Sequence, residues 1–322
     1  MRAGLEPAVS GAQVVGVEVR DARALKRHVP VGGSAGDGGH GVTLDAAEQH
    51  RRAADFERRV QSLVFRAPQR RGKFLWLPVD DGTRSADVSA GLAAPAPASV
   101  PTRALLVHLG MSGQMLLRAP DAPDDRFVRI RLWVEHPEHG ELRLDFADQR
   151  LFGSLALDDL IDDGGEAGAL PAQAGHIARD PLDPRFDDDA FVVSFRRKNT
   201  GVKRAILDQT LISGVGNIYA DEALWRTRLH PEMLGRDVSV RGARRLLAEL
   251  RAVFAKALAE GGTSFDAQYV NVNGQAGYFA HSLNAYGRTG EPCPRCGGPI
   301  KRITFGGRGS HFCPRCQRRV VR

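Results

Sequence analysis

Apolar and polar residues alternate with a period of two along much of the first half of the chain. The pattern begins in residues 12–29 (AQVVGVEVRDARALKRHV), whose valine-rich start is typical of a half-buried strand. It returns in residues 72–79 (GKFLWLPV) and 104–118 (ALLVHLGMSGQMLLR), and again from residue 127 to residue 157, where residues 138–140 (EHG) form a turn. The pattern predicts that the first half is mainly β-structure.

Three segments interrupt this pattern. Residues 31–41 (VGGSAGDGGHG) are too rich in glycine to pack and predict a flexible insertion, and the Ala/Pro-rich residues 83–101 predict a loose loop. Residues 158–189 hold ten acids against two arginines, with Gly, Pro and Ala between them. They indicate a linker or a peripheral pair of helices. We place a domain boundary there, with a first domain of residues 1–165.

The apolar spacing then changes to that of helices. Apolar residues recur every three or four positions in residues 202–212 (VKRAILDQTLI), 217–229 (NIYADEALWRTRL) and 240–261 (VRGARRLLAELRAVFAKALAEG). These segments predict a small helical domain within residues 176–262. A glycine-rich stretch leads from it into a tail, residues 284–322.

Positive charge is concentrated in that tail. The 322-residue chain carries a net charge of +7, and its last 39 residues hold nine Lys or Arg against one acid, Glu291. A solvated tail has this composition, but so does a surface that docks an acidic polymer. No run of eighteen apolar residues suggests a membrane span, and the N-terminus does not resemble a secretory signal. We therefore expect a cytoplasmic protein with no membrane partner.

All four cysteines lie in the same tail. Cys293 and Cys296 form one CxxC, Cys313 and Cys316 form another, and sixteen residues separate the pairs. Four thiolates at this spacing predict one structural zinc ion, since a redox pair needs a single CxxC and disulfides are unfavoured in the cytosol. The zinc would stiffen a basic hairpin, KRITFGGRGSHF (residues 301–312). Such a hairpin suits a ribosomal protein, a transcription factor or a DNA enzyme equally well.

The stretch LISGVGNIYADEAL (residues 211–224) is the other informative one. Gly214 and Gly216 permit a tight turn, and Asn217 is placed to begin a helix as its N-cap. Free amides at a helix N-terminus bind anions, and Lys198 and Lys203 lie upstream, where both can flank the same phosphate. An ordinary helix corner packed on itself explains the stretch as well.

These motifs occur in a characteristic order: LDQTLISGVGNIYADEAL, then GGTSF…GQAGYF…AYGRTGEPCPRCG, then GRGSHFCPRCQ. In this order the chain resembles the bacterial formamidopyrimidine-DNA glycosylases over most of its length. The resemblance implies an α+β fold with an N-terminal β-sandwich, a helix–two-turn–helix domain and a C-terminal zinc finger of residues 284–322. It implies double-stranded damaged DNA as the partner, bound by a monomer.

The resemblance also implies roles for individual residues. Asn217 and Lys203 would grip the DNA backbone beside the lesion, with Lys198 near them, and Arg308 at the hairpin tip would hold the phosphates flanking the flipped nucleotide and assist the second elimination. Lys73, in RRGKFLWL, would act in β-elimination. The side chains that would fill the gap left by the extruded base are Met111, Arg150 and Phe152, and residues 271–277 would cap the flipped purine.

The chain departs from the family at its start. Members begin Pro-Glu, in which the secondary amine of the proline attacks the sugar and the Glu protonates it; this sequence begins MRAGLEPAVSG, and Glu6 does not match by position. We expect the true start to lie upstream, restoring Pro-Glu; a paralogue that binds lesions without cutting is the alternative. Two smaller departures are Arg126, where the family has His-x-His, and Leu151, which is often a second arginine.

The expected activity is that of a base-excision-repair glycosylase with associated lyase activity. It would remove 8-oxoguanine and ring-opened formamidopyrimidines by base flipping, and then break the strand. The alternatives are an endonuclease VIII-like enzyme for oxidised pyrimidines, a non-catalytic damage-binding protein and a general zinc-ribbon binder. The GQAGYF loop favours a purine substrate over a pyrimidine.

Overall fold

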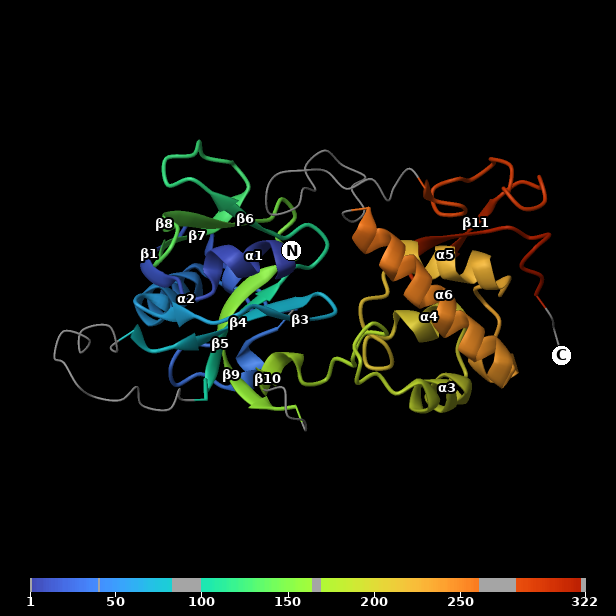
Figure 1. The fold of residues 1–322 in the computed structure, drawn as a ribbon, viewed down its shortest axis with the longest axis horizontal. Helices are drawn as coiled ribbons and strands as arrows, with labels where there is room; N and C mark the ends of the chain where they lie inside the picture. Colours follow the sequence, from blue (N-terminus) through green and yellow to red (C-terminus); the bar gives the residue numbers. More distant parts are fainter. Residues whose placement is uncertain (1, 40, 83–99, 164–168, 261–281, 320–322) are drawn as a thin grey trace. The chain divides into compact units, whose positions relative to one another are not determined.

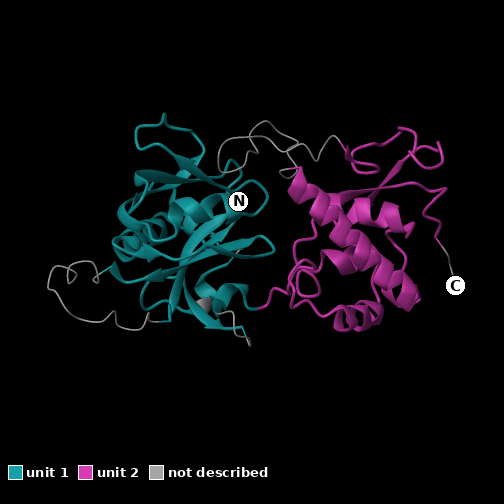
Figure 2. Ribbon diagram, in the orientation of Figure 1, with its two compact units in different colours: residues 1–175, 269–275 teal, residues 176–268, 276–322 magenta. Residues whose placement is uncertain are grey.

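The computed structural model describes residues 2–39, 41–82, 100–163, 169–260 and 282–319. These residues separate into two compact units, residues 2–175 (unit 1) and residues 176–319 (unit 2) (Figures 1 and 2). The division falls inside the acid-rich segment 158–189. The glycine-rich loop predicted for residues 271–277 lies outside the described residues.

Unit 1 is built on an antiparallel sheet with the strand order β10-β9-β5-β4-β2-β1-β7-β8-β6, and β3 pairs with β4 beside this path. Hydrogen bonding between successive pairs fixes the register, for example Leu105 opposite Leu77 and Leu157. The strands are β1 (Gln13–Val19), β2 (Val64–Phe65), β3 (Gln69–Arg71), β4 (Phe74–Asp80), β5 (Arg103–His108), β6 (Gln114–Arg118), β7 (Val128–His136), β8 (Gly140–Ala147), β9 (Ser154–Asp162) and β10 (Ala169–Pro171).

The two halves of this sheet enclose one apolar core. Helices α1 (Arg2–Val9) and α2 (Ala46–Val60) add side chains to it. Fully buried members are Leu5, Val14, Phe56, Leu77, Leu105, Leu132, Phe146 and Leu155. The alternating pattern in the sequence therefore does produce a β-sandwich, because alternate side chains of the longer strands, such as Leu75 and Leu77 or Leu155 and Leu157, with one position between the members of each pair, point into this core.

Two predictions about unit 1 are wrong. The described part of segment 31–41 packs: Arg52 Nη2 donates to the Asp37 carbonyl at 2.8 Å, and the amide of Gly39 donates to the Lys26 carbonyl at 3.0 Å. Of the two alternatives for segment 158–189, the pair of helices does not form at its start. Instead, β9 continues to Asp162 and pairs with β10. Asp159 and Asp162 are exposed there, whereas Asp158 accepts hydrogen bonds from Gln173 and Asp163 pairs with Arg71.

Unit 2 contains a small helical domain with its own core. Its helices are α3 (Asp188–Arg197), α4 (Val202–Leu207), α5 (Asn217–Thr227) and α6 (Val240–Ala259). Phe195, Ile206, Leu224, Leu246 and Leu250 are buried between them. The helical spacing of the sequence predicts α4, α5 and α6. Helix α3 has two acids in its first turn, Asp188 and Asp189, which stabilise its N-terminus.

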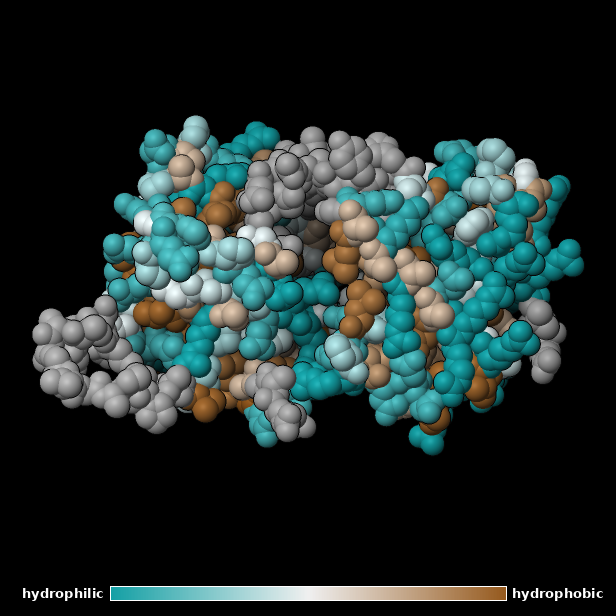
Figure 3. Space-filling model, in the orientation of Figure 1, coloured by the Kyte–Doolittle hydropathy of each residue, from teal (hydrophilic) through white to brown (hydrophobic). Residues whose placement is uncertain are grey.

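The C-terminal part of unit 2 is a two-stranded hairpin, β11 (Lys301–Phe305) and β12 (Arg308–Phe312), as predicted. Gly306 and Gly307 form its turn with positive φ angles of 52° and 75°. Figure 3 shows mainly hydrophilic side chains over this end of unit 2. No helix among the described residues is long and apolar enough to cross a membrane.

Candidate nucleic-acid interface

The four cysteines form one compact cluster at the base of the hairpin. Their sulfur atoms all lie within 4.8 Å of one another, and the Cys296 and Cys313 sulfurs are 3.5 Å apart. A tetrahedral zinc site with Zn–S bonds of about 2.3 Å needs sulfurs roughly 3.8 Å apart. The cluster therefore fits one structural zinc ion, with all four positions taken by protein ligands.

The zinc site is joined to α5 by Trp225. The indole Nε1 donates to Cys293 Sγ at 3.4 Å, and the guanidinium of Arg295 lies 4.0 Å from the indole ring and donates to the Trp225 carbonyl at 2.9 Å. Trp225, Ala285 and Ile300 are the only buried apolar residues that join the cysteines in this core among the described residues. So small a core needs the metal to hold its shape.

Asp221 of α5 binds β12 of the hairpin. Its buried carboxylate accepts hydrogen bonds from Ser310 Oγ at 3.0 Å and from the His311 amide at 2.8 Å. Lys203 Nζ, which is fully buried, lies 2.7 Å from the same carboxylate and donates to the Gly309 carbonyl at 3.3 Å. Burial lowers the pKa of Lys203, and the charge of Asp221 opposes that shift.

Lys203 therefore occupies a different position from the one the sequence suggests. Its ammonium lies inside the protein, paired with Asp221, and not on the surface where a phosphate would approach. The ion pair links α4, α5 and β12, which places the backbone of the hairpin beside the N-terminus of α5.

Asn217 is the first residue of α5 and not, as the sequence predicts, its N-cap. Gly216 is the N-cap, and no side chain caps the helix there. This leaves the Asn217 side chain to serve the hairpin: its Nδ2 donates to the Gly309 carbonyl at 3.1 Å. Two residues on different helices, Lys203 and Asn217, thus bind the same carbonyl next to Arg308.

A cavity of about 690 Å³ opens between this helix N-terminus and the hairpin tip. Its lining includes Asn217 and the exposed Arg308, together with Gly306 of the turn. Arg204, which sequence reasoning overlooked, lines it as well and is exposed. Its signal was present in VKRAIL, where a helix that buries Val202 and Ile206 turns residue 204 outward.

Lys198 lies beside the same surface. Its Nζ is 2.8 Å from Asp208 Oδ2, and it shares a smaller cavity of about 330 Å³ with Arg204 and Thr200. Arg204, Arg308 and Lys198 therefore lie along one surface of unit 2, beside the N-terminal amides of α5, with Asp208 and Glu232 among them. Such a surface suits the phosphates of a nucleic acid.

In unit 1, three turns that carry predicted site residues meet. Lys73 is exposed on the turn between β3 and β4, and its carbonyl accepts a bond from the Leu109 amide at 3.1 Å. Met111 lies in the next turn (the 109–113 loop), with 45% of its surface exposed. Arg150, which is exposed, and Phe152, which is half-buried, lie in the third turn (the 148–153 loop).

The 109–113 and 148–153 loops are joined by Asp148, which is buried. Its carboxylate accepts bonds from Ser112 Oγ, from the Arg150 amide at 3.1 Å and from the Gly153 amide at 2.6 Å. The loops also touch directly, because a Cβ at Gly110 would lie 2.6 Å from the Phe152 carbonyl carbon. Met111 and Arg150 therefore lie at neighbouring exposed turns and are not part of the buried core.

Family models match nearly the whole chain. Residues 1–155 match the formamidopyrimidine-DNA glycosylase N-terminal domain, residues 177–268 match the H2TH domain of the same glycosylases, and residues 290–319 match a zinc finger found in FPG and IleRS.

Several known proteins are similar over their full length. A formamidopyrimidine-DNA glycosylase of Leifsonia xyli is 52% identical, with 99% of this chain and 97% of that protein covered; one of Nocardioides sp. is 49% identical, with 98% and 91% covered. Among solved structures, Lactococcus lactis Fpg bound to DNA with an abasic site has a TM-score of 0.72 and 25% identity over 99% of this chain and 97% of that one. The same protein has been solved with FAPY-dG and with an oxidised pyrimidine in DNA.

The four close cysteines agree with the zinc-finger match, and the relatives cover nearly all of the chain. The chain belongs to the formamidopyrimidine-DNA glycosylase family and is a DNA glycosylase of base-excision repair.

Proposed function

We propose that this glycosylase removes oxidised purines, 8-oxoguanine and formamidopyrimidines, from double-stranded DNA and then cleaves the strand at the abasic site. It does so as a monomer in the cytoplasm. The observation that carries the proposal is the cavity of about 690 Å³ in unit 2, which is lined by Arg308, Arg204 and the N-terminus of α5, a set of groups that binds phosphates.

The cavity accounts for DNA binding at the lesion. Arg308 and Asn217 bind the phosphates that flank the damaged nucleotide, with Arg204 and Lys198 on the strand beside it. Lys203 contributes through the hairpin that it holds, because its own ammonium is buried against Asp221. A rigid hairpin costs little conformational entropy on binding, so the arginine is already in place when DNA arrives.

The turns of unit 1 account for base flipping. Met111 and Phe152 present apolar surface that replaces the stacking lost when a base leaves the duplex. Arg150 carries five N–H donors at the same place and hydrogen-bonds the partner base left behind. The backbone of both loops is fixed by Asp148, so the three side chains enter the duplex together.

The reaction needs a neutral amine that attacks the anomeric carbon, expels the base and leaves an iminium, which then loses a proton and eliminates the phosphate. In the family this amine is an N-terminal proline, beside a Glu that protonates the sugar. An α-amine titrates near pH 8 and is partly neutral at physiological pH, unlike an exposed lysine. Lys73 and Arg308 act in the two eliminations that follow.

Excision assays on matched duplexes test the substrate. Duplexes carrying 8-oxoguanine, thymine glycol or undamaged guanine at one position are incubated under single-turnover conditions with a version of the chain extended upstream to begin Pro-Glu, so that the amine and the acid of the family are both present. We expect release of 8-oxoguanine to be faster than that of thymine glycol by at least about tenfold, which is the lower end of the discrimination that a binding pocket provides between similar substrates. Faster release of thymine glycol would overturn the purine assignment. Tight binding without release of either base would indicate a non-catalytic paralogue.

A further inference from the structure

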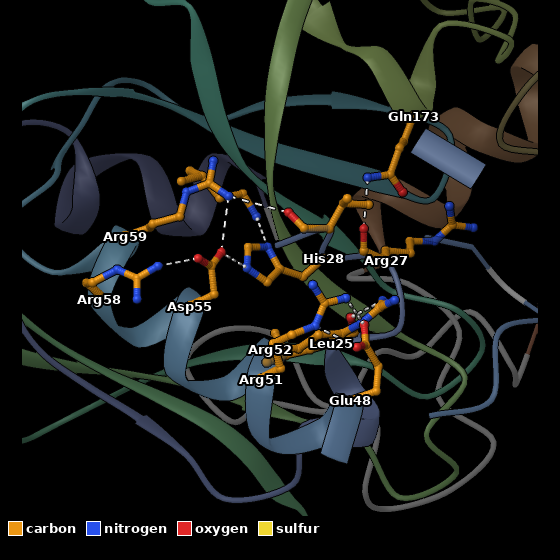
Figure 4. Close-up of polar contacts among 12 residues, drawn as sticks. Leu25, Arg27, His28, Glu48, Arg51, Arg52, Asp55, Arg58, Arg59 and Gln173 are labelled. Atoms are coloured by element: carbon orange, nitrogen blue, oxygen red, sulfur yellow. Dashed lines mark hydrogen bonds and ion pairs between the residues drawn. The ribbon is translucent and has the colours of Figure 1, made fainter. Parts of the chain in front are cut away.

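The segment of residues 25–29, which links η1 (Ala22–Leu25) to the 31–41 insertion, is unusually well held for a loop; we refer to it as the strap. Arg52 of α2 donates to the carbonyls of Leu25 at 3.3 Å and Lys26 at 3.1 Å, while its Nε donates to Glu48 at 2.5 Å (Figure 4). The two bonds to carbonyls fix the backbone of the strap to α2, and the bond to Glu48 orients the guanidinium of Arg52.

The other end of the strap is fixed by a buried histidine. His28 Nε2 donates to Asp55 Oδ2 at 3.1 Å, and His28 Nδ1 accepts a bond from the Leu157 amide at 3.3 Å (Figure 4). Burial lowers the pKa of His28 to about 4, so the ring is neutral and fits this donor–acceptor arrangement. The carbonyls of Arg27 and Val29 accept bonds from Gln173 and Arg59.

Only one side chain of the strap reaches the 148–153 loop among the contacts described. Lys26, which is 7% exposed, donates from Nζ to the Leu151 carbonyl at 2.5 Å, across 125 residues of sequence. Leu151 has a φ of 55°, in the left-handed region that L-residues other than glycine rarely adopt. The residues on either side of it are Arg150 and Phe152. A bond to its carbonyl favours this unusual conformation over the ordinary ones.

We propose that Lys26 is a positioning residue for base flipping: the strap carries its ammonium to the Leu151 carbonyl, and this bond fixes the 148–153 loop so that Arg150 and Phe152 enter the duplex in one orientation. Asp148 holds the loop at its two ends, at the amides of residues 150 and 153, and Lys26 holds its middle. The inference rests on the proposed role of Arg150 opposite the lesion.

The charge of Lys26 suits this role. Burial lowers its pKa, and the charge of Asp148 opposes that shift, so the ammonium is attracted toward the loop that it serves. A charged donor makes a stronger bond to a carbonyl than a neutral one. The same residue lies too deep to contact DNA, which separates positioning from direct binding.

The test measures how well the protein discriminates the base opposite the gap. Dissociation constants are determined for duplexes that carry a tetrahydrofuran abasic-site analogue opposite C, T, G or A. In Lys26→Met we expect the ratio between the best and the worst opposite base to fall by about fivefold or more, the effect of loosening a specific arginine–base contact. Lys26→Arg, which keeps a cationic donor, should retain the ratio within about twofold.

Arg23→Met is the matched control, because Arg23 is an exposed cation of η1, next to the strap, that pairs with Asp21 and makes no contact with the 148–153 loop among the contacts described. It should retain the discrimination of the parent protein. Since Lys26→Met has the potential to unfold unit 1, Lys26→Gln is measured beside it, and both must melt above the assay temperature. A folded Lys26→Met or Lys26→Gln with unchanged discrimination would overturn the proposal.

A second readout follows the loop itself. Amide hydrogen exchange at residues 150–153 should be at least about tenfold faster in Lys26→Met than in Arg23→Met, with no change in β7 or β8. Equal exchange in the two variants would refute a positioning role. If the parent protein binds the abasic analogue no better than undamaged DNA, the proposed function fails, and the exchange experiment still judges the contact between Lys26 and the loop.

Discussion

The hairpin β11–β12 and the 148–153 loop each present one arginine at an exposed turn, but they are held in different ways. The hairpin has a core of three apolar residues beside its cysteines, and it depends on the zinc site and on the buried pair Lys203–Asp221. The 148–153 loop lies on a sandwich with an extensive apolar core and is shaped by hydrogen bonds that its amides donate to Asp148 and that Lys26 donates to Leu151. The hairpin needs the metal in order to fold, whereas the 148–153 loop needs its polar contacts only to keep one conformation.

The supports of the hairpin therefore determine whether it folds, whereas the supports of the 148–153 loop determine how its side chains are oriented. Breaking a support of the hairpin should unfold it and abolish its binding surface, because little else holds it together. Breaking a support of the 148–153 loop should leave unit 1 folded and change only the orientation of Arg150 and Phe152. The predictions below, from the largest effect to the smallest, test whether the two elements respond independently.

Removal of zinc should have the largest effect. Structural zinc contributes on the order of 10 kcal/mol to folding in small metal-dependent domains, so Cys313→Ser or treatment with a strong chelator should unfold the hairpin. Binding to an abasic duplex, measured by fluorescence anisotropy, should weaken by at least about 100-fold. Amide exchange in β5 and β9 of unit 1 should stay as it was. Loss of protection there would show that the two elements are not independent.

Replacement of Asp221 by Asn should come next. Lys203 would remain buried without its counter-charge, which costs about 3–5 kcal/mol of unfolding free energy for unit 2. Urea denaturation followed by tryptophan fluorescence measures this loss. The double variant Lys203→Met/Asp221→Asn should recover part of it, because no uncompensated charge is left inside. Equal stability of the single and double variants would contradict the ion-pair argument.

The buried histidine of the strap should make unit 1 sensitive to acid. The folded-state pKa of His28 is lowered to about 4 from the ordinary value of 6.5, so between these values the unfolded chain binds a proton that the native chain does not. The contribution of His28 to the free energy of unfolding is therefore fully present above pH 6.5, and it falls by up to about 3 kcal/mol as the pH approaches 4.

The variant His28→Gln should lose this part of the pH dependence. His50→Gln, which alters an exposed histidine of α2, is the matched control and should behave as the parent. Thermal unfolding at a series of pH values between 4 and 7.5 gives the comparison. If His28→Gln and His50→Gln show the same slope, His28 is not a source of the acid sensitivity.

Arg308→Ala should have the most localised effect. The hairpin stays folded, since Arg308 is exposed at its tip, and affinity for an abasic duplex should fall by about 10- to 100-fold with loss of one phosphate contact. Its salt dependence should fall by about one unit of slope. Arg302→Ala, on the same hairpin, is the comparison variant; an equal loss there would indicate a diffuse basic surface.

Much of this architecture is readable from the sequence, because local rules govern it. The spacing of Cys293, Cys296, Cys313 and Cys316 predicts the zinc cluster, and alternation predicts the sandwich. Helix α2 was overlooked although Asp45 caps it at the Glu48 amide, because the charge-rich surface of that helix obscures its apolar stripe. Asp187, Asp188 and Asp189 belong to an acid-rich stretch that suggests a linker, although these three residues cap and stabilise the start of α3.

The contacts that give the site its geometry were beyond the reach of the sequence. Lys26 and Leu151 are 125 residues apart, and Asn217 and Gly309 are 92 apart. Neither pairing follows from propensity or periodicity, since both depend on which turns the fold brings together. The burial of Lys203 belongs to the same class: the stripe of Val202 and Ile206 turns Arg204 outward but leaves residue 203 at the edge of the buried face, and its position is decided only by the partner Asp221.

The central claim is that this glycosylase forms a covalent intermediate with lesion DNA, and borohydride trapping tests it most directly. The 322-residue chain that begins at Met1, and a version extended upstream to begin Pro-Glu, are each incubated with an 8-oxoguanine duplex and borohydride, which reduces the iminium to a stable adduct. We predict an adduct with the extended version on the damaged duplex and none on undamaged DNA. If both versions bind the lesion and neither is trapped, the account of the chemistry is contradicted.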